Sequence, residues 1–94
     1  MRYPLFTYIK DGLEVTMSEP HEEHQEIGVR VYFERWSDAH DAFDSMDIWL
    51  PDGKMEHIIG FSPAEVYNYE KMVLDLKQPI LESSKEYYAE DCHV

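Results

Sequence analysis

The stretch from Gly60 to Tyr88, GFSPAEVYNYEKMVLDLKQPILESSKEYY, decides the fold because it contains the long helical pattern of this chain. Ser62, Pro63 and Glu65 are typical of a helix start: the serine caps the first turn, the proline suits its first position, and the glutamate completes a capping box. Apolar residues then recur at spacings of three, four or seven, at Val66, Tyr69, Val73, Leu76, Ile80 and Tyr87. This spacing places them on one helix face, which must be buried against another element.

Pro79 falls inside this pattern. A proline in a helix interior removes a backbone donor and clashes with the carbonyl group four residues earlier, here that of Asp75. The apolar spacing nevertheless continues from Leu76 to Ile80. We therefore expect either one helix kinked at Pro79 or two helices that meet near Gln78, with the same face buried in both.

The same stretch carries four further large side chains: Tyr67, Tyr69, Met72 and Tyr88. We expect them to pack in the core together with the rest of the apolar helix face. The alternative is that part of this face forms the seam of a homodimer.

Before Gly60, apolar and polar residues alternate in five short runs, which is typical of β-strands with one buried face. The runs span residues 3–9, 13–18, 27–35, 44–50 and 54–59. Asp11-Gly12 and Pro51-Asp52-Gly53 supply turn residues, while residues 19–26 and 36–43 break the alternation and are expected to be loops. The sequence therefore predicts a single α+β domain over residues 1–94: a five-stranded antiparallel meander in the order 1-2-3-4-5, with the C-terminal helix on one face.

One set of alternate residues in the strands is apolar and is expected to face the helix. This inner set is Leu13, Val15, Met17, Ile27, Val29, Val31, Phe33, Met46, Ile48 and Leu50. In the last strand, residues 54–59, neither alternate set is cleanly apolar, so its orientation stays open.

Net charge is the most unusual property of the composition: 20 acidic and eight basic residues give −12 at pH 7. Such a charge repels nucleic acid phosphates and anionic membranes and attracts basic proteins or cations, although it also keeps a small protein in solution. The sequence has no secretory pattern and no membrane-spanning run, and its single cysteine, Cys92, cannot form an internal disulfide. We expect a cytoplasmic protein that binds neither nucleic acid nor membranes.

Two histidines, His21 and His24, lie among four carboxylates in residues 19–26. Imidazole and carboxylate groups bind zinc and similar ions, so a metal site at these histidines is one hypothesis and a solvated loop is the other. Their spacing of three residues differs from the metalloprotease motif. Four aspartates recur at every third residue from Asp38 to Asp47, which matches no calcium loop and predicts an acidic, partner-facing edge.

The face of the sheet opposite the helix carries residues that suit protein binding. The predicted contact residues are Arg30, Tyr32, Glu34, Asp47 and Trp49, with Tyr8, Glu14 and Thr16 beside them. Tyrosine, tryptophan and arginine are enriched at protein interfaces. The alternative is that these side chains form cross-strand pairs alone, each worth a few tenths to about 1 kcal/mol.

Three functional hypotheses follow. The leading one is a non-catalytic interaction protein that docks on a basic partner, as an inhibitor, an antitoxin or an immunity protein does. The second is a metal-binding regulatory protein that uses His21 and His24. The third is a small acid–base enzyme with carboxylates in a cleft between helix and sheet, although no catalytic residue can be selected among twenty carboxylates and no cofactor motif is present.

Overall fold

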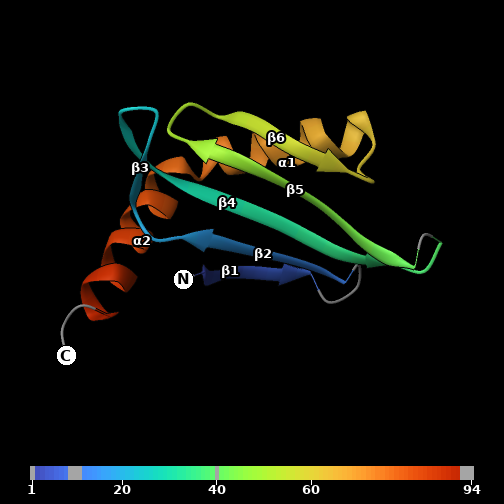
Figure 1. The fold of residues 1–94 in the computed structure, drawn as a ribbon, viewed down its shortest axis with the longest axis horizontal. Helices are drawn as coiled ribbons and strands as arrows, with labels where there is room; N and C mark the ends of the chain where they lie inside the picture. The colour runs from blue at the N-terminus through green and yellow to red at the C-terminus, as the bar shows by residue number, and fades with distance from the viewer. Residues whose placement is uncertain (1, 9–11, 40, 92–94) are drawn as a thin grey trace.

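The computed structural model describes the backbone of residues 2–8, 12–39 and 41–91, and the side chains of these residues except at positions 6–8, 87, 90 and 91. Cys92 and the side chains of Tyr8 and Tyr87 therefore lie outside the described residues. The described elements are β1 (Arg2–Tyr8), β2 (Leu13–Ser18), β3 (His21–Glu23), β4 (Glu26–Ser37), β5 (Ala42–Leu50), β6 (Lys54–Ile59), α1 (Pro63–Asp75) and α2 (Lys77–Asp91). Figure 1 shows one long, twisted sheet with both helices on the same side of it.

The main strands form an antiparallel meander in the order β1-β2-β4-β5-β6. The predicted α+β fold and the order of its five strands are thus confirmed. β3 is an additional strand that pairs with the first residues of β4. The expectation that residues 19–26 form a loop was wrong, because His24 and Gln25 make a two-residue turn with φ of 51° and 67°. Positive φ at both positions is the geometry of a type I′ hairpin turn, here built without the glycine that usually signals it.

The second expected loop, residues 36–43, is also shorter than predicted. β4 continues to Ser37 and β5 begins at Ala42, with Trp36 opposite Phe43 in the last part of the ladder. The rings of Trp36 and Phe43 meet edge to face, with centroids 5.2 Å apart. Such an aromatic cross-strand pair stabilises the hairpin beyond the point where apolar alternation ends.

The core lies between the inner face of the sheet and the two helices. Nine of the ten residues predicted for the inner face are buried, the exception being Ile27, which is 73% exposed. The expectation for Ile27 was wrong because β4 pairs with β5 only from Val29 onward and with β2 only from Val31 onward. Ile27 belongs instead to the β3–β4 hairpin, which extends past the end of the main sheet.

The C-terminal stretch forms two helices, which is the second of the two predicted alternatives. Ser62 caps α1 through the expected capping box with Glu65. The break falls at Leu76, two residues before the predicted position, so Pro79 becomes the third residue of α2. The first backbone bond of α2 then runs from Ile80 N–H to the Leu76 carbonyl, 3.0 Å away, and needs no donor from the proline. No described helix is long and apolar enough to cross a membrane.

The helix face that packs on the sheet is narrower than predicted. Val73 and Ile80 are buried, and Tyr69 and Met72 pack against the core as expected. Tyr67 and Tyr88 are 65% and 43% exposed, so their assignment to the core was wrong. Tyr67 precedes Val73 by six residues, which places it about 120° around the helix from the buried face.

Arg35 fastens the start of α1 to the sheet. From the inner face of β4 its guanidinium donates to Asp44 on β5, to the carboxylate of Glu65 and to the Gly60 carbonyl. The hydrogen bonds from Arg35 to the Glu65 carboxylate lower the pKa of Glu65 from 4.5 to about 2, with a further contribution from the Ser62 backbone N–H. The helix therefore begins at a fixed point beside the start of β5.

Candidate functional site on the outer face of the sheet

Both helices lie on one side of the sheet and leave the outer face uncovered (Figure 1). Cross-strand pairing places all five predicted contact residues on this outer face. In the β4–β5 ladder, Arg30 lies opposite Trp49, Tyr32 opposite Asp47 and Glu34 opposite Ser45. Thr16 and Glu14 on β2 continue the same rows, because they lie opposite Tyr32 and Glu34. Strict alternation along β2, β4 and β5 therefore brings the predicted face together.

The β3–β4 hairpin folds over one end of this face. Gly28 makes the close approach feasible: a Cβ atom there would lie 1.9 Å from the Leu50 carbonyl oxygen and 2.7 Å from an indole carbon of Trp49. His21 consequently meets the Trp49 ring edge to face, with centroids 5.2 Å apart. Trp49 is only 6% exposed, and its indole N–H donates to Glu26 Oε1 at 2.9 Å.

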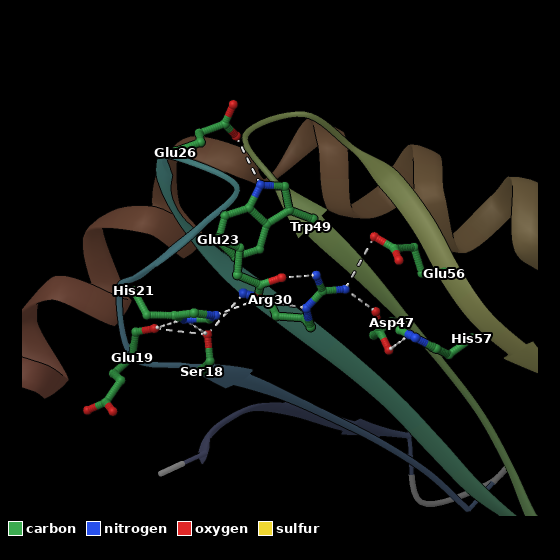
Figure 2. Close-up of polar contacts among 10 residues, drawn as sticks. All are labelled: Ser18, Glu19, His21, Glu23, Glu26, Arg30, Asp47, Trp49, Glu56 and His57. Carbon is green, nitrogen blue, oxygen red and sulfur yellow. Dashed lines mark hydrogen bonds and ion pairs between the residues drawn. The ribbon is translucent and has the colours of Figure 1, made fainter.

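Arg30 on β4 lies at the centre of a network of carboxylates from three other strands, β3, β5 and β6 (Figure 2). Its Nε and Nη2 donate to the two oxygens of Glu23, at 3.2 and 2.5 Å, and its Nη1 donates to Asp47. Glu56 on β6 lies 3.7 Å from the same Nη1, and His57 Nδ1 lies 2.9 Å from the second oxygen of Asp47. The donors of Arg30 are thus engaged by the protein's own side chains.

This network shifts the pKa values of Glu23 and Arg30. Hydrogen bonds from Arg30, followed by the contact with His21, lower the pKa of Glu23 from 4.5 to about 2 against the opposing effect of burial. Hydrogen bonds to Glu23 and Asp47 raise the pKa of Arg30 above its usual value. Glu23 and Arg30 therefore stay charged throughout the physiological pH range.

Tyr32 and Glu34 lie further along the face and share a partner, Arg2 of β1. The Arg2 guanidinium carbon lies 3.7 Å from the centre of the Tyr32 ring, and Nη1 donates to Glu34 Oε1 at 2.6 Å. The side chains of Arg2 and Glu34 are 50% and 38% exposed, so this pair lies at the surface. A cation over a ring face is attracted by the negative charge of the π-system.

Two adjoining pockets lie on the outer face of the sheet. Pocket A, about 200 Å³, is lined by Glu23, His24, Glu26, Arg30, Trp49, Asp52, Lys54 and Glu56. Pocket B, about 220 Å³, is lined by Arg2, Tyr32, Phe33, Glu34, Ser45, Met46, Asp47 and His57. The contact between Arg30 of pocket A and Asp47 of pocket B joins them. In pocket A, four carboxylates against two cations leave two negative charges in excess.

The two histidines proposed as metal ligands have different surroundings. His21 Nε2 lies 2.5 Å from Glu23 Oε2, and its Nδ1 lies 3.0 Å from the Glu19 carbonyl oxygen. His24 is exposed at the hairpin turn. Within residues 2–8, 12–39 and 41–91, no group of three or more histidine, cysteine, aspartate or glutamate side chains is arranged to hold a metal ion.

The four regularly spaced aspartates divide between surface and interior. Asp38 and Asp41 are exposed, whereas Asp44 and Asp47 are 5% and 8% exposed. The expectation of an acidic, partner-facing edge was therefore wrong for Asp44 and Asp47, which are buried. The reason is cross-strand pairing, because Asp44 meets Arg35 on the inner face and Asp47 meets Arg30 on the outer face.

An acid–base enzyme would need a carboxyl group whose pKa is raised toward neutrality. The two resolved carboxyl shifts, at Glu23 and Glu65, run in the opposite direction. A pocket of about 160 Å³ between α2 and the sheet is lined by Pro20, Ile27, Gly28, Val29, Pro51, Leu81 and Lys85. Among the described residues that line this pocket there is no carboxylate.

Several network members were not predicted from the sequence. Glu23 and His21 were assigned to a loop, and the glycine-free turn that follows them gave no hairpin signal. The face of Glu56 stays open in the sequence because neither alternate set of residues 54–59 is cleanly apolar. The structure shows a bulge in this strand: Glu56 pairs with Asp47 but Ile59 pairs with Ser45. His57, inside the bulge, has φ of 54°. The signal that was available is the arginine itself, since a partly buried arginine requires carboxylate partners.

Comparisons with family models, with curated proteins and with solved structures give no significant match to this chain. The class of this protein is therefore described by its fold and site alone. It is an α+β domain whose helices cover one face of the sheet and whose other face carries an arginine-centred network of carboxylates.

Proposed function

We propose that this chain is a non-catalytic, cytoplasmic interaction module that docks on a basic protein through the outer face of its sheet. An inhibitor, an antitoxin or an immunity protein acts in this way when it covers the basic surface of its target. The support is the net charge of −12 together with the excess of carboxylates in pocket A. Opposite charges steer such partners together and select against wrong ones.

The arrangement around Arg30 carries this proposal. Because Glu23 and Asp47 engage its donors, Arg30 is not free to bind an anionic ligand. The remaining charged groups of pocket A are Glu26, Asp52 and Glu56 against Lys54. A lysine or arginine side chain from a partner fits this chemistry, because carboxylates are the preferred acceptors of both.

The network also prepares the pocket before binding. Charge-assisted hydrogen bonds hold Glu23 and Asp47 in place, and Trp49 is held by its hydrogen bond to Glu26. Side chains that are already ordered lose little entropy when a partner arrives. In pocket B, by contrast, Arg2 already engages both Glu34 and the ring of Tyr32, so pocket A is the expected site for a partner's basic side chain.

The test is affinity purification of the tagged chain from its native cell extract at about 50 mM and about 500 mM salt. The variant Glu26→Gln/Asp52→Asn/Glu56→Gln removes three charges from pocket A while keeping similar shapes. The matched control, Asp75→Asn/Glu82→Gln/Glu86→Gln, removes three exposed charges from the helices. We expect a stoichiometric basic partner that is retained at low salt by the wild type and the control, and lost by the pocket variant.

Two outcomes contradict the proposal. The first is a partner that the pocket variant and the helix control retain equally, because binding would then depend on total charge or on another surface. The second is a preparation without any basic partner at either salt concentration. Circular dichroism and thermal unfolding of both variants establish that the comparison is made between folded proteins.

A further inference from the structure

The end of the outer face furthest from β3 carries an exposed apolar patch, which we define as Trp36, Phe43 and Ile59. These side chains are 49%, 59% and 61% exposed. Trp36 lies opposite Phe43, and Ile59 lies opposite Ser45, a residue that lines pocket B. The patch therefore adjoins the proposed docking face: Trp36 and Phe43 lie near the end of the β4–β5 hairpin, and Ile59 is the last residue of β6. Figure 1 shows this hairpin at the end of the sheet away from β3.

The patch is held in a defined shape. The rings of Trp36 and Phe43 stand edge to face at 80°, and the Trp36 indole N–H donates to Asp38 Oδ1 at 2.9 Å. Neither ring contributes to the core, which lies on the opposite face. Large aromatic side chains that are exposed but ordered are the residues that most often supply binding energy in protein interfaces.

The two edges of the sheet are poorly suited to pair with another strand. Pro4 interrupts β1, and the β1–β2 register shifts between Pro4 and Phe6. At the other edge, the register of β6 shifts around His57. Proline and bulges are devices that protect edge strands from pairing. A partner is therefore expected to contact side chains of the face rather than extend the sheet.

The charges around the patch indicate what covers it. Glu34 on the same face and Asp38 at the hairpin end are carboxylates, and the nearby cation Arg2 already pairs with Glu34. A second copy of this chain would bring another net charge of −12 to the contact and would be repelled. An apolar side chain with lysine or arginine neighbours meets both the rings and the carboxylates.

We propose that the patch is the apolar anchor site for the basic partner and takes an aliphatic or aromatic side chain flanked by basic residues. This inference rests on the proposed function, because it assigns a further contact to the same partner. The pockets then supply charge complementarity, and the patch supplies the apolar burial that discriminates among basic proteins.

Two labelled synthetic peptides test the anchor: a lysine-rich peptide with a central leucine, and the same peptide with serine in its place. Fluorescence anisotropy at low salt measures the affinity of each peptide for the wild type and for Trp36→Ser/Phe43→Ser. We expect the leucine peptide to bind the wild type about tenfold tighter, since burying part of a leucine is worth about 1.5 kcal/mol. The double variant should bind both peptides with the affinity that the wild type has for the serine peptide.

The control is Tyr67→Ser, which removes an aromatic ring of similar exposure from α1, away from the outer face. Equal affinity of the two peptides for the wild type overturns the anchor but leaves the proposed function intact, whereas no binding of either peptide counts against both. Sedimentation velocity of the chain alone adds one more outcome: a dimer that the double variant abolishes would assign the patch to a second copy and overturn the proposal.

Discussion

Two arginines on β4, five residues apart, lie on opposite faces of one sheet, and each binds one aspartate and one glutamate directly. Arg35 binds Asp44 of β5 and Glu65 of α1, and Arg30 binds Asp47 of β5 and Glu23 of β3. The Arg35 cluster joins a helix to the sheet, whereas the Arg30 cluster joins a short hairpin to an uncovered face. The Arg30 cluster also has an additional carboxylate, Glu56, beyond the two that its arginine binds directly.

Both clusters consist of an arginine between carboxylates, but we expect them to have different roles. The Arg35 cluster should be structural, whereas the Arg30 cluster should shape the proposed binding face. Loss of Arg35 would free α1 and expose the core beneath it, because the helix start is held by this residue. Loss of Arg30 would free a hairpin whose carboxylates can turn into water. The first cluster should therefore determine global stability, and the second should determine local order and the charge of the outer face.

Acidification should have the largest effect, because it acts on both clusters at once. The pKa values of Glu23 and Glu65 are lowered to about 2, below the ordinary value of 4.5. Since the folded pKa is depressed, their contribution to stability is complete above the ordinary value and is lost as pH falls toward about 2. We expect the urea midpoint to fall across this acidic window, and Glu23→Gln and Glu65→Gln each to flatten the profile. An unchanged midpoint between pH 4.5 and pH 2 would contradict the assigned pairing.

Arg35→Met should have the largest effect among the single substitutions considered. It leaves Asp44, which is 5% exposed, without its guanidinium partner and releases Glu65 at the helix start. Breaking such a buried pair typically costs 3–5 kcal/mol, so we expect unfolding free energy to fall by about 3 kcal/mol. Urea denaturation provides the measurement, with Lys71→Met on the exposed side of α1 as the control. A loss no greater than that of the control would show that α1 is held by apolar packing alone.

Arg30→Met should cost less in global stability, about 1 kcal/mol, because Glu23 can regain water when the hairpin loosens and Asp47, although only 8% exposed, keeps its contact with His57. Its main effect should be local. We expect amide hydrogens of residues 21–28 to lose protection from exchange and the fluorescence of Trp49 to shift to longer wavelength, since the hairpin covers this indole. Trp36→Phe in both proteins isolates the Trp49 signal. A global loss equal to that of Arg35→Met, with no local change, would remove the distinction between the clusters.

The sequence predicted the sheet and its order because alternation along β2, β4 and β5 is strict, and a strict pattern fixes which side chains share a face. It did not predict β3, because His24 and Gln25 adopt a type I′ turn without the glycine, asparagine or aspartate residues that usually signal one. The bulge at His57 likewise interrupts the alternation of β6, so the sequence did not predict which face carries Glu56. Arg30, Asp47 and Trp49 were assigned to the correct face, but their partners Glu23 and Glu56 come from these two irregular segments.

Glu56→Gln should have the smallest effect on folding among these substitutions. It can therefore separate a role in binding from a role in stability within the Arg30 cluster. Glu56 lies 3.7 Å from Arg30 Nη1, and its side chain is 32% exposed, so stability should change by less than about 0.5 kcal/mol. Glu65→Gln, the corresponding change in the other cluster, should cost about 1 kcal/mol because it weakens both the capping box and the Arg35 pair. If Glu56→Gln nevertheless weakens retention of a basic partner, this carboxylate serves binding rather than folding. A stability loss as large as that of Glu65→Gln would instead make Glu56 a structural member of the Arg30 cluster.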